Sequence, residues 1–480
     1  MVTRNELLRE LNFGSVDSES EENLDKIFIQ TDNFEDFLND NIALMLGSKG
    51  AGKSAIFRLF SQFEDSARKM SGHRLDNIYL VAGTGFKDTA EMDDMQILNL
   101  IEEGKVTAEA SWKIYITFKI IHELYRKYKI ICGNKSKRVL QKVGDIKDCR
   151  LLGVISFLFR KFIGELPKVN QIDFGNISIS VSSHNSISIY DLLNEINSYL
   201  DGEKKTVWIL LDKIDELFAN NIEGRKKCIE GLFMTYIDFV ARYSNIKLKI
   251  FLRTDIWSTL SFVNKSHITD KTTTIKWMEQ SLRELLLKRA CQSQIISQYV
   301  CSKANISDWS DSPERSFDVI FPAQVYSGPR EAKTLSWMIE RATDGLSGVY
   351  PREIINFSNY AVKEDLKSPD EAITSIISGN AIKHSFAEVS KVKVESYLSE
   401  FSHLQKHFER FNGKQTATFT QSELIDIMAG LEPSGEEMIK QLHETGVISY
   451  STQNALTSQT TLTIPRLFRI GLGIVMPGRP

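Results

Sequence analysis

Cysteine is scarce in this sequence, and the few cysteines present are scattered. Five occur in 480 residues, and no two of them form a CxxC pair. An odd, dispersed set argues against a disulfide framework and predicts reduced thiols in a cytoplasmic protein. The eight histidines also lack the spacing of metal ligands. The sequence therefore favours neither a disulfide-rich secreted fold nor a zinc centre.

Long apolar runs and a dominant charge are also missing. No apolar stretch approaches the ~18 residues of a membrane helix, and the opening MVTRNELLRELNFG lacks the apolar core of a secretion signal. The formal charge is −3, which excludes a chain that is basic throughout and coats nucleic acid. A composition of 42% hydrophobic and 25% charged residues predicts a globular protein of several domains with no membrane partner.

Short apolar runs alternate with amphipathic stretches in the first half of the chain. IALMLG, NIYLVAG, VWILLD and IKLKIFL have the pattern of buried strands, and KSAIFRLFSQF and CIEGLFMTYIDFVARY have that of helices. This alternation predicts a parallel α/β sheet whose ligands bind at the carboxyl ends of the strands. A helical pattern followed by a predicted strand hairpin forms an insertion at 105–190.

Beyond residue 275 the strand signals stop, and the pattern predicts a helical lid. The closing stretch has the order helix, helix and two short strands, which is typical of a winged helix-turn-helix. From residue 391 onward nine basic residues balance nine acidic ones, so DNA binding and protein packing are both open for this part. The predicted domains are an N-terminal segment (1–40), a P-loop ATPase core (41–272), a helical lid (273–390) and a winged-helix-like domain (391–480).

One stretch matches a phosphate-binding motif. Residues 47–54 read GSKGAGKS, which fits G-x-x-x-x-G-K-[ST] between a predicted strand and a predicted helix. Glycines let backbone N–H groups turn toward phosphate oxygens, and the following helix adds its positive N-terminal end. Lys53 is expected to reach the β- and γ-phosphates of ATP, and Ser54 to place its hydroxyl on Mg²⁺. The predicted nucleotide-binding residues here are Gly47, Ser48, Lys49, Gly50, Ala51, Gly52, Lys53, Ser54 and Ala55.

A carboxylate follows the predicted strand VWILL. Mg²⁺ prefers oxygen ligands, and P-loop enzymes often supply one from a strand beside the phosphate loop, so Asp212 is the second predicted metal ligand. An N-cap aspartate is the alternative. Many P-loop ATPases continue with Glu, but this chain has Lys213, which is cationic and cannot act as a base at neutral pH. Asp215 and Glu216 can replace the Glu if the chain turns back over the site, or they can simply begin an exposed helix.

Two arginines are candidate sensors of the nucleotide. Arg253 ends the predicted strand in KIFLRTDIW, where its guanidinium can contact the γ-phosphate or pair with Asp255. Arg352 lies at a helix start in YPREIINF, from which it can reach the nucleotide or remain in solvent.

Together these stretches resemble a family of bacterial P-loop ATPases, called FunZ-type, related to the AAA+, KAP and STAND groups. The resemblance covers nearly the whole chain through LNFGSVDSESE, LGSKGAGKSAIF, VWILLDKIDELF, FLRTDIW, YPREIINF and IPRLFRIGLGI. It implies an ATP-binding α/β core, a helical lid and a winged-helix-like domain, with Arg253 as a sensor and Arg352 as a lid sensor. LLDKIDEL is also similar to the LDEIDEL of origin-recognition ATPases, and Lys213 in place of the usual Glu predicts slow hydrolysis.

These observations predict a nucleotide-driven switch, with Mg-ATP held between core and lid. The expected partners are further copies of the chain in a homo-oligomer and an effector protein encoded nearby, and the resemblance suggests a role in anti-phage defence. Two alternatives stay open. One is a DNA-associated, initiator- or loader-like ATPase that binds DNA through residues 391–480, and the other is a nucleotide sensor that does not hydrolyse ATP.

Overall fold

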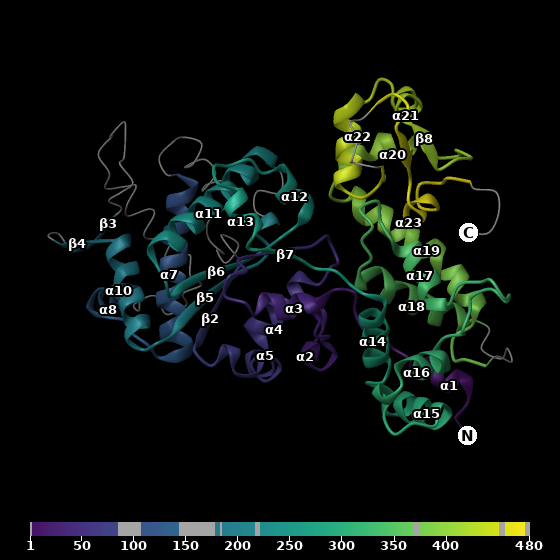
Figure 1. Ribbon diagram of the computed structural model, residues 1–480, viewed down its shortest axis with the longest axis horizontal. Coiled ribbons are helices and arrows are strands. Elements are labelled where there is room, and N and C mark those ends of the chain that lie inside the picture. The colour runs from purple at the N-terminus through teal and green to yellow at the C-terminus, as the bar shows by residue number, and fades with distance from the viewer. Residues whose placement is uncertain are drawn as a thin grey trace. The chain divides into compact units, whose positions relative to one another are not determined.

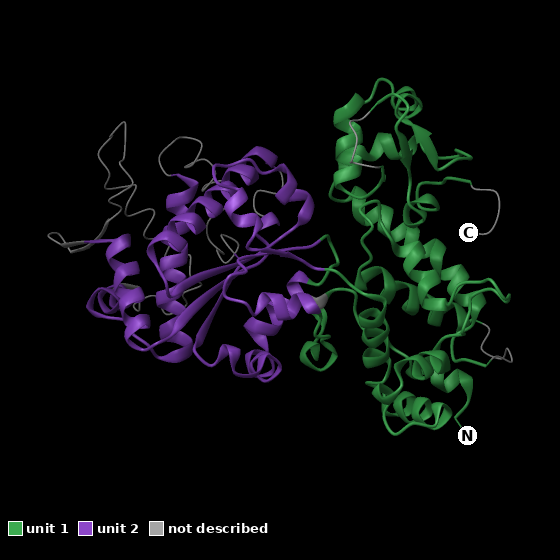
Figure 2. Cartoon of the chain, viewed as in Figure 1, with its two compact units in different colours: residues 1–31, 48–52, 276–480 green, residues 32–47, 53–275 purple. Residues whose placement is uncertain are grey.

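The computed structural model describes residues 2–84, 107–143, 178–182, 185–216, 221–367, 374–450 and 457–475. The chain divides into two compact units (Figure 2): unit 1 contains residues 1–31, 48–52 and 276–480, and unit 2 contains residues 32–47 and 53–275. The middle of the predicted insertion, residues 144–177, lies outside the described residues. No helix in the described ranges is long and apolar enough to cross a membrane.

A five-stranded parallel sheet forms the centre of unit 2 (Figure 1). Its strand order is β2-β5-β6-β1-β7, so β1, which leads into the GSKGAGKS loop, lies inside the sheet between β6 and β7. This confirms the predicted α/β fold with a P-loop core. The strands are β1 (Leu44–Leu46), β2 (Ile78–Gly83), β5 (Thr206–Leu211), β6 (Ile246–Leu252) and β7 (Thr272–Thr274).

Helices cover both faces of this sheet, as the alternating side chains require. Ile209 and Leu211 of β5 join a buried cluster with α7, α10 and α11, whereas Trp208 points to the opposite face and meets the ring of Phe37 in α3. The helices of unit 2 are α3 (Asp32–Phe37), α4 (Lys53–Gln62), α5 (Glu64–Ser71), α7 (Ala108–Tyr128), α8 (Asn134–Val143), α10 (Ile189–Gly202), α11 (Ile222–Arg242), α12 (Thr254–Thr259) and α13 (Ser266–Thr269). A separate hairpin joins β3 (Ser178–Ser182) to β4 (Asn185–Ser188).

A lysine is buried in the middle of the sheet. Lys249 of β6 has no exposed surface, and its Nζ lies 2.9 Å from the carbonyl oxygen of Phe37, 2.6 Å from that of Asn39 and 2.7 Å from that of Ile42. Burial lowers the pKa of Lys249 to about 7. The three carbonyls match the three N–H groups of an ammonium, and they fasten the chain between α3 and β1 to the sheet. This contact holds β1 in place directly before the phosphate-binding motif.

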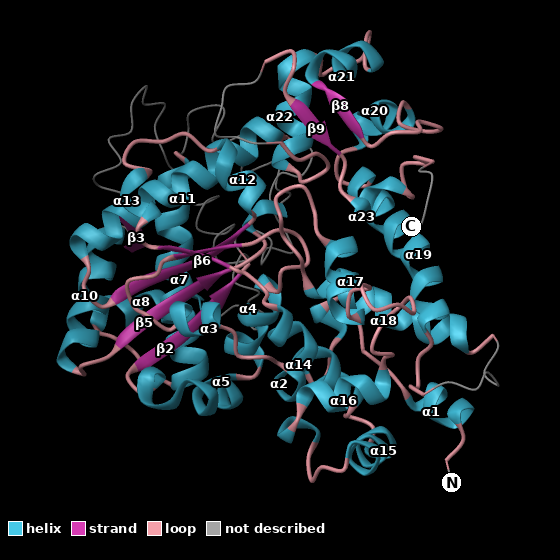
Figure 3. Ribbon diagram, turned by 45° about the vertical axis from the view of Figure 1, so that its right-hand side comes forward, coloured by secondary structure: helices cyan, strands magenta, loops and turns pink. Residues whose placement is uncertain are grey.

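Unit 1 is mainly helical, and its C-terminal part carries a small antiparallel sheet (Figure 3). Its helices are α1 (Arg4–Glu10), α2 (Leu24–Ile27), α14 (Glu279–Ala290), α15 (Gln294–Ala304), α16 (Pro313–Ile320), α17 (Thr334–Ala342), α18 (Pro351–Asp365), α19 (Gly379–Leu398), α20 (Gln405–Glu409), α21 (Gln421–Ile427), α22 (Gly435–Glu444) and α23 (Arg466–Arg469). The strands are β8 (Thr418–Thr420) and β9 (Thr461–Thr463).

The C-terminal sheet differs in one respect from the expected order of helix, helix and two strands. β8 precedes α21 and pairs with β9, while Ser449 after α22 forms only an isolated bridge to Thr463. The sequence does not predict β8, because its three residues, Thr-Phe-Thr, are too few for their alternation to indicate a strand. The expected boundary at 390/391 falls inside α19, which packs against both α18 and α23.

Candidate functional site

Three neighbouring strands of unit 2 end side by side at the carboxyl edge of the sheet. Leu46 of β1 pairs with Leu252 of β6, and β6 continues the ladder to β5. The residues that follow these strands are Gly47, Arg253 and Asp212. The parallel sheet thus brings together residues that are more than 40 positions apart in the sequence, as predicted from the order of elements.

Helix α4 begins at Lys53, directly after the glycine loop, and its first turn carries Ser54 and Ala55. The Nζ of Lys53 donates a hydrogen bond of 2.6 Å to the carbonyl oxygen of Gly47. Burial lowers the pKa of Lys53, and the carboxylates of Asp215 and Asp212 oppose this shift. The lysine therefore lies where a phosphate could replace the Gly47 carbonyl as its partner.

Asp212 is buried at the end of β5, with 2% of its surface exposed. Burial raises the pKa of Asp212 to about 6, although a hydrogen bond from the Ser54 hydroxyl acts in the opposite direction. Its Oδ2 has no hydrogen-bond partner within the described residues. A buried carboxylate oxygen without a donor, beside a hydroxyl, suits a hard cation such as Mg²⁺. The described residues contain no cluster of three or more His, Cys, Asp or Glu.

The segment after Asp212 turns sharply. Lys213 adopts a left-handed backbone with φ 60°, and residues Ile214–Glu216 form one 3₁₀ turn. Burial raises the pKa of Asp215, while the nearby cations Lys53 and Arg253 act against that rise. Glu216 is exposed. Of the two acids predicted to replace the missing Glu, Asp215 interacts electrostatically with Lys53.

Arg253 forms a two-point ion pair within its own turn. Its Nε lies 3.0 Å from Oδ1 of Asp255, and its Nη2 lies 2.8 Å from Oδ2. This is the strand-end pair that was the alternative to a sensor role. Because Arg253 also interacts electrostatically with Lys53 and Asp215, it lies within the same group of charges.

The tip of the glycine loop, residues 48–52, packs within unit 1. Gly50 has φ +86°, and a β-carbon placed there would lie 2.9 Å from Cβ of Arg352. Both the left-handed backbone and this close approach require glycine. Within the described residues, Nε of Arg352 is buried without a hydrogen-bond partner. Arg352, predicted from the helix start after Pro351, therefore does lie against the loop.

Three further contacts at the loop tip were not predicted. The hydroxyl of Tyr350 donates to Ser48 Oγ at 2.9 Å, and the indole Nε1 of Trp277 donates to the carbonyl oxygen of Ala51 at 2.9 Å. Lys49 forms an ion pair with Glu400 and a hydrogen bond of 3.2 Å to Ser396 Oγ. Only Tyr350 carried a sequence signal, because it directly precedes Pro351 and Arg352. The others depend on where α14 and α19 lie within unit 1.

The parallel sheet, the glycine loop after β1 and the helix α4 that begins at Lys53 have the arrangement of a P-loop fold. No known family model matches the sequence. The chain is similar to the putative transposon gamma-delta 80.3 kDa protein of Escherichia coli K12, with 25% identity over 264 residues, which are 52% of this chain and 34% of that protein. The match thus spans about a third of the length of this relative.

Among solved structures, the chain is similar to Cdc6p from Pyrobaculum aerophilum, with 12% identity, a TM-score of 0.28 and coverage of 88% of this chain and 83% of the other. It is also similar to the ORC1 protein of Aeropyrum pernix in complex with DNA, with 10% identity, a TM-score of 0.33 and coverage of 90% and 85%. These scores are too low to carry an argument about function, which must come from the site itself.

Proposed function

We propose that this chain binds ATP with Mg²⁺ and hydrolyses it slowly, as a nucleotide-driven switch. The observation that carries the proposal is the orphaned Oδ2 of buried Asp212, next to Ser54 and within the charge group of Lys53. A phosphate-binding lysine and two oxygen donors for a divalent cation are what a nucleoside triphosphate requires. Ser54 and Asp212 would hold Mg²⁺, which neutralises charge on the phosphates when bound.

Different groups of the protein would contact the phosphates of the nucleotide. The N–H groups of the glycine loop and the first turn of α4 orient the phosphates, and Lys53 exchanges the Gly47 carbonyl for a phosphate oxygen. Arg352, beside Gly50, has a buried N–H group to offer to a phosphate oxygen of the nucleotide. We infer that nucleotide binding alters the contacts of the loop tip with α18 and α19, and that this alteration is the output of the switch.

Asp215 is proposed as the group that orients the attacking water. Its pKa is raised by burial, which makes it a better proton acceptor than an exposed carboxylate, and it lies near Lys53. Asp215→Asn should lower phosphate release in a single turnover by about 100-fold or more while ATP still binds. Glu216→Gln is the matched control and should change little, because Glu216 is exposed. Tight ATP binding by the wild type without any phosphate release would instead establish the non-hydrolysing sensor.

The nucleotide site itself is tested by Lys53→Ala. We expect this change to weaken the binding of a fluorescent ATP analogue by about 100-fold or more, because a charge-assisted contact to two phosphates is lost. Lys69→Ala, which alters an exposed lysine of α5 in the same unit, should bind the analogue as the wild type does. Unchanged affinity in Lys53→Ala would disprove the site.

A second candidate function is a DNA-associated ATPase. It is favoured by the winged-helix-like order β8, α21, α22 and β9 at the end of unit 1. The α22 helix, in the position of a recognition helix, exposes Glu436 and Glu437, which phosphates would repel. Measuring the mass of the protein and its ATP turnover with and without DNA tests this candidate together with the proposed homo-oligomer. The suggested role in anti-phage defence, with an effector encoded nearby, stays a hypothesis from the resemblance.

A further inference from the structure

A dense run of basic residues joins α7 to α8 in unit 2. Between residues 124 and 144 there are seven Lys or Arg and no Asp or Glu, in a chain whose formal charge is −3. The remainder of the chain is therefore net acidic, and this local excess of positive charge is not a consequence of overall composition. The seven bases are Arg126, Lys127, Lys129, Lys135, Lys137, Arg138 and Lys142.

Several of these bases have no acidic partner in the part of the chain that the structure describes. Lys129, Lys137 and Arg138 are exposed and form no ion pair with any described residue. Tyr125, in the last turn of α7 and four residues before Lys129, leaves 46% of its surface exposed. We name Tyr125, Lys129, Lys137 and Arg138 the α7–α8 basic surface. Three other bases have acidic partners: Arg126 with Glu123, Lys127 with Glu64, and Lys135 with Asp191.

The orientation of α8 fixes the direction of its charges. Ser136 and Val139 are buried, whereas Lys137 and Arg138 lie on the outward side. The N-terminal end of α8 already has an anionic partner, because the carboxylate of Glu195 accepts hydrogen bonds from Lys135 N at 2.9 Å and from Ser136 N at 2.7 Å. An external anion would therefore bind through the side chains and not through the helix end.

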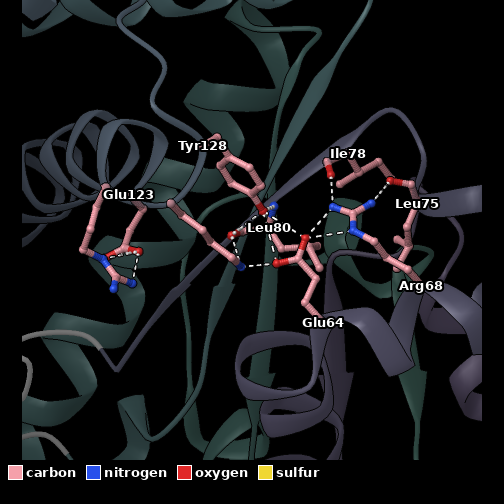
Figure 4. A network of polar contacts seen from close by, with 9 residues as sticks. Glu64, Arg68, Leu75, Ile78, Leu80, Glu123 and Tyr128 are labelled. Atoms are coloured by element: carbon pink, nitrogen blue, oxygen red, sulfur yellow. Dashed lines mark hydrogen bonds and ion pairs between the residues drawn. The ribbon is translucent and has the colours of Figure 1, made fainter.

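The basic surface rests on a rigid base. Glu64 of α5 lies between Arg68 on one side and the end of α7 on the other (Figure 4), and it accepts a hydrogen bond of 3.1 Å from the hydroxyl of Tyr128. That hydroxyl in turn accepts from the backbone N of Leu80, at 3.0 Å. Burial raises the pKa of Glu64, but the ion pairs with Lys127 and Arg68 outweigh it and hold the pKa below its usual value.

This network also covers the edge of the sheet. β2 is an edge strand of the described sheet. The carbonyl oxygen of Ile78 accepts a hydrogen bond from Arg68 at 2.8 Å, and the backbone N–H of Leu80 donates one to the hydroxyl of Tyr128. An edge that is capped by side chains does not recruit another strand. The last turn of α7 is thus locked, so its outward charges are presented with little entropy to lose on binding.

We propose that the α7–α8 basic surface binds the sugar-phosphate backbone of nucleic acid without reading base sequence. Cations that have no acidic partner among the described residues suit a polyanion with regularly spaced charges, and the exposed ring of Tyr125 in the same surface can stack on a base. A membrane is a poorer fit, because the apolar side of α8 is already buried in the core of unit 2. The proposal does not rest on the nucleotide site, and it places nucleic-acid contact on unit 2 and not on the winged-helix-like part.

The test uses the full chain and a labelled 20-base-pair duplex, with binding followed by fluorescence anisotropy over a series of salt concentrations. The surface variant combines Lys129→Glu, Lys137→Glu and Arg138→Glu. The matched variant reverses two exposed lysines and one exposed arginine in the C-terminal part of unit 1, as Lys406→Glu, Arg410→Glu and Lys440→Glu. Each lost phosphate contact removes about 0.9 from the slope of log K against log salt, so the surface variant should bind about 100-fold more weakly near 0.1 M salt, with a slope flatter by about 3.

Each outcome of the binding experiment supports or overturns the proposal. Loss of binding in the surface variant alone supports the proposal, provided that its circular dichroism spectrum and thermal unfolding match those of the wild type. Equal binding by the wild type and the surface variant overturns it. Loss of duplex binding in the matched variant alone would show that DNA binds to the winged-helix-like part, and it would also overturn the proposal. Binding of the wild type to phosphatidylserine vesicles but not to duplex or single-stranded DNA or RNA would show a membrane-binding surface instead.

Discussion

Replacing Asp212 by Asn should stabilise the nucleotide-free protein. The carboxylate of Asp212 is 2% exposed, and burial raises its pKa to about 6, whereas an unfolded Asp titrates near ~3.9. Because the Asp212 carboxyl holds its proton more tightly in the folded protein than in the unfolded chain, the folded wild type loses stability as the pH rises from about 4 to 6. This loss is complete above pH 6. Asparagine has nearly the same shape and cannot ionise, so the variant escapes this penalty.

The size of the effect follows from the shift. A rise of about two pKa units corresponds to about 3 kcal/mol at neutral pH. The attraction of Lys53 is already contained in this shift, because it lowers the pKa that burial raises. We therefore expect a stabilisation of about 2–3 kcal/mol at pH 7.5, falling to about 1 kcal/mol at pH 4.5 and toward zero below pH 4.

Hydrogen exchange of peptides from β5 and β6 is the appropriate assay, because it reports the opening of unit 2 separately from unit 1. The protein is first freed of nucleotide and divalent cations with apyrase and EDTA. The exposed Asp270 provides the control, since Asp270→Asn should change stability by less than about 0.5 kcal/mol at every pH. When Mg-ATP is added, the wild type should become more stable than Asp212→Asn, because only the wild type is stabilised by binding the nucleotide. An Asp212→Asn variant that is less stable at pH 7.5 without nucleotide would refute the reasoning.

Three further changes test other parts of the site and its scaffold. Lys213→Glu restores the acid usual at this position and should raise single-turnover phosphate release about 10-fold or more, whereas Lys213→Ala should not. Gly50→Ala should weaken ATP binding in a titration, because the added β-carbon would clash with Arg352. The control is Gly413→Ala, which has φ +76° but open space around it. This variant has only the backbone strain and should leave ATP affinity unchanged. Glu64→Gln should destabilise unit 2 by about 1–3 kcal/mol at pH 7, measured by exchange of the β2 peptide, and the difference should narrow as the pH falls through the lowered pKa of the folded carboxylate, because its ion pairs are then lost.

Local patterns were sufficient to select the candidate residues that the structure brings together. The strand, glycine loop and helix around Lys53 are adjacent in sequence, and the end of a strongly apolar strand pointed to Asp212. The parallel order of strands then places both at one edge. The choice between Asp215 and Glu216 could not be made in advance, because it depends on the left-handed turn at Lys213 and on which side chain that turn brings near Lys53.

The P-loop motif and its α/β core can be predicted from the sequence, since a motif of eight consecutive residues carries its own geometry. The residues that surround the loop depend on how distant segments pack. Lys249 lies in a strand, where a lysine would be expected to face solvent, yet three carbonyls of a distant segment take up its charge inside the core. Tyr350, Trp277 and Glu400 likewise contact the loop tip from sequence distances at which no local pattern operates. Such partners are chosen by packing, because a buried or confined charge is stable only where the fold provides its counterpart.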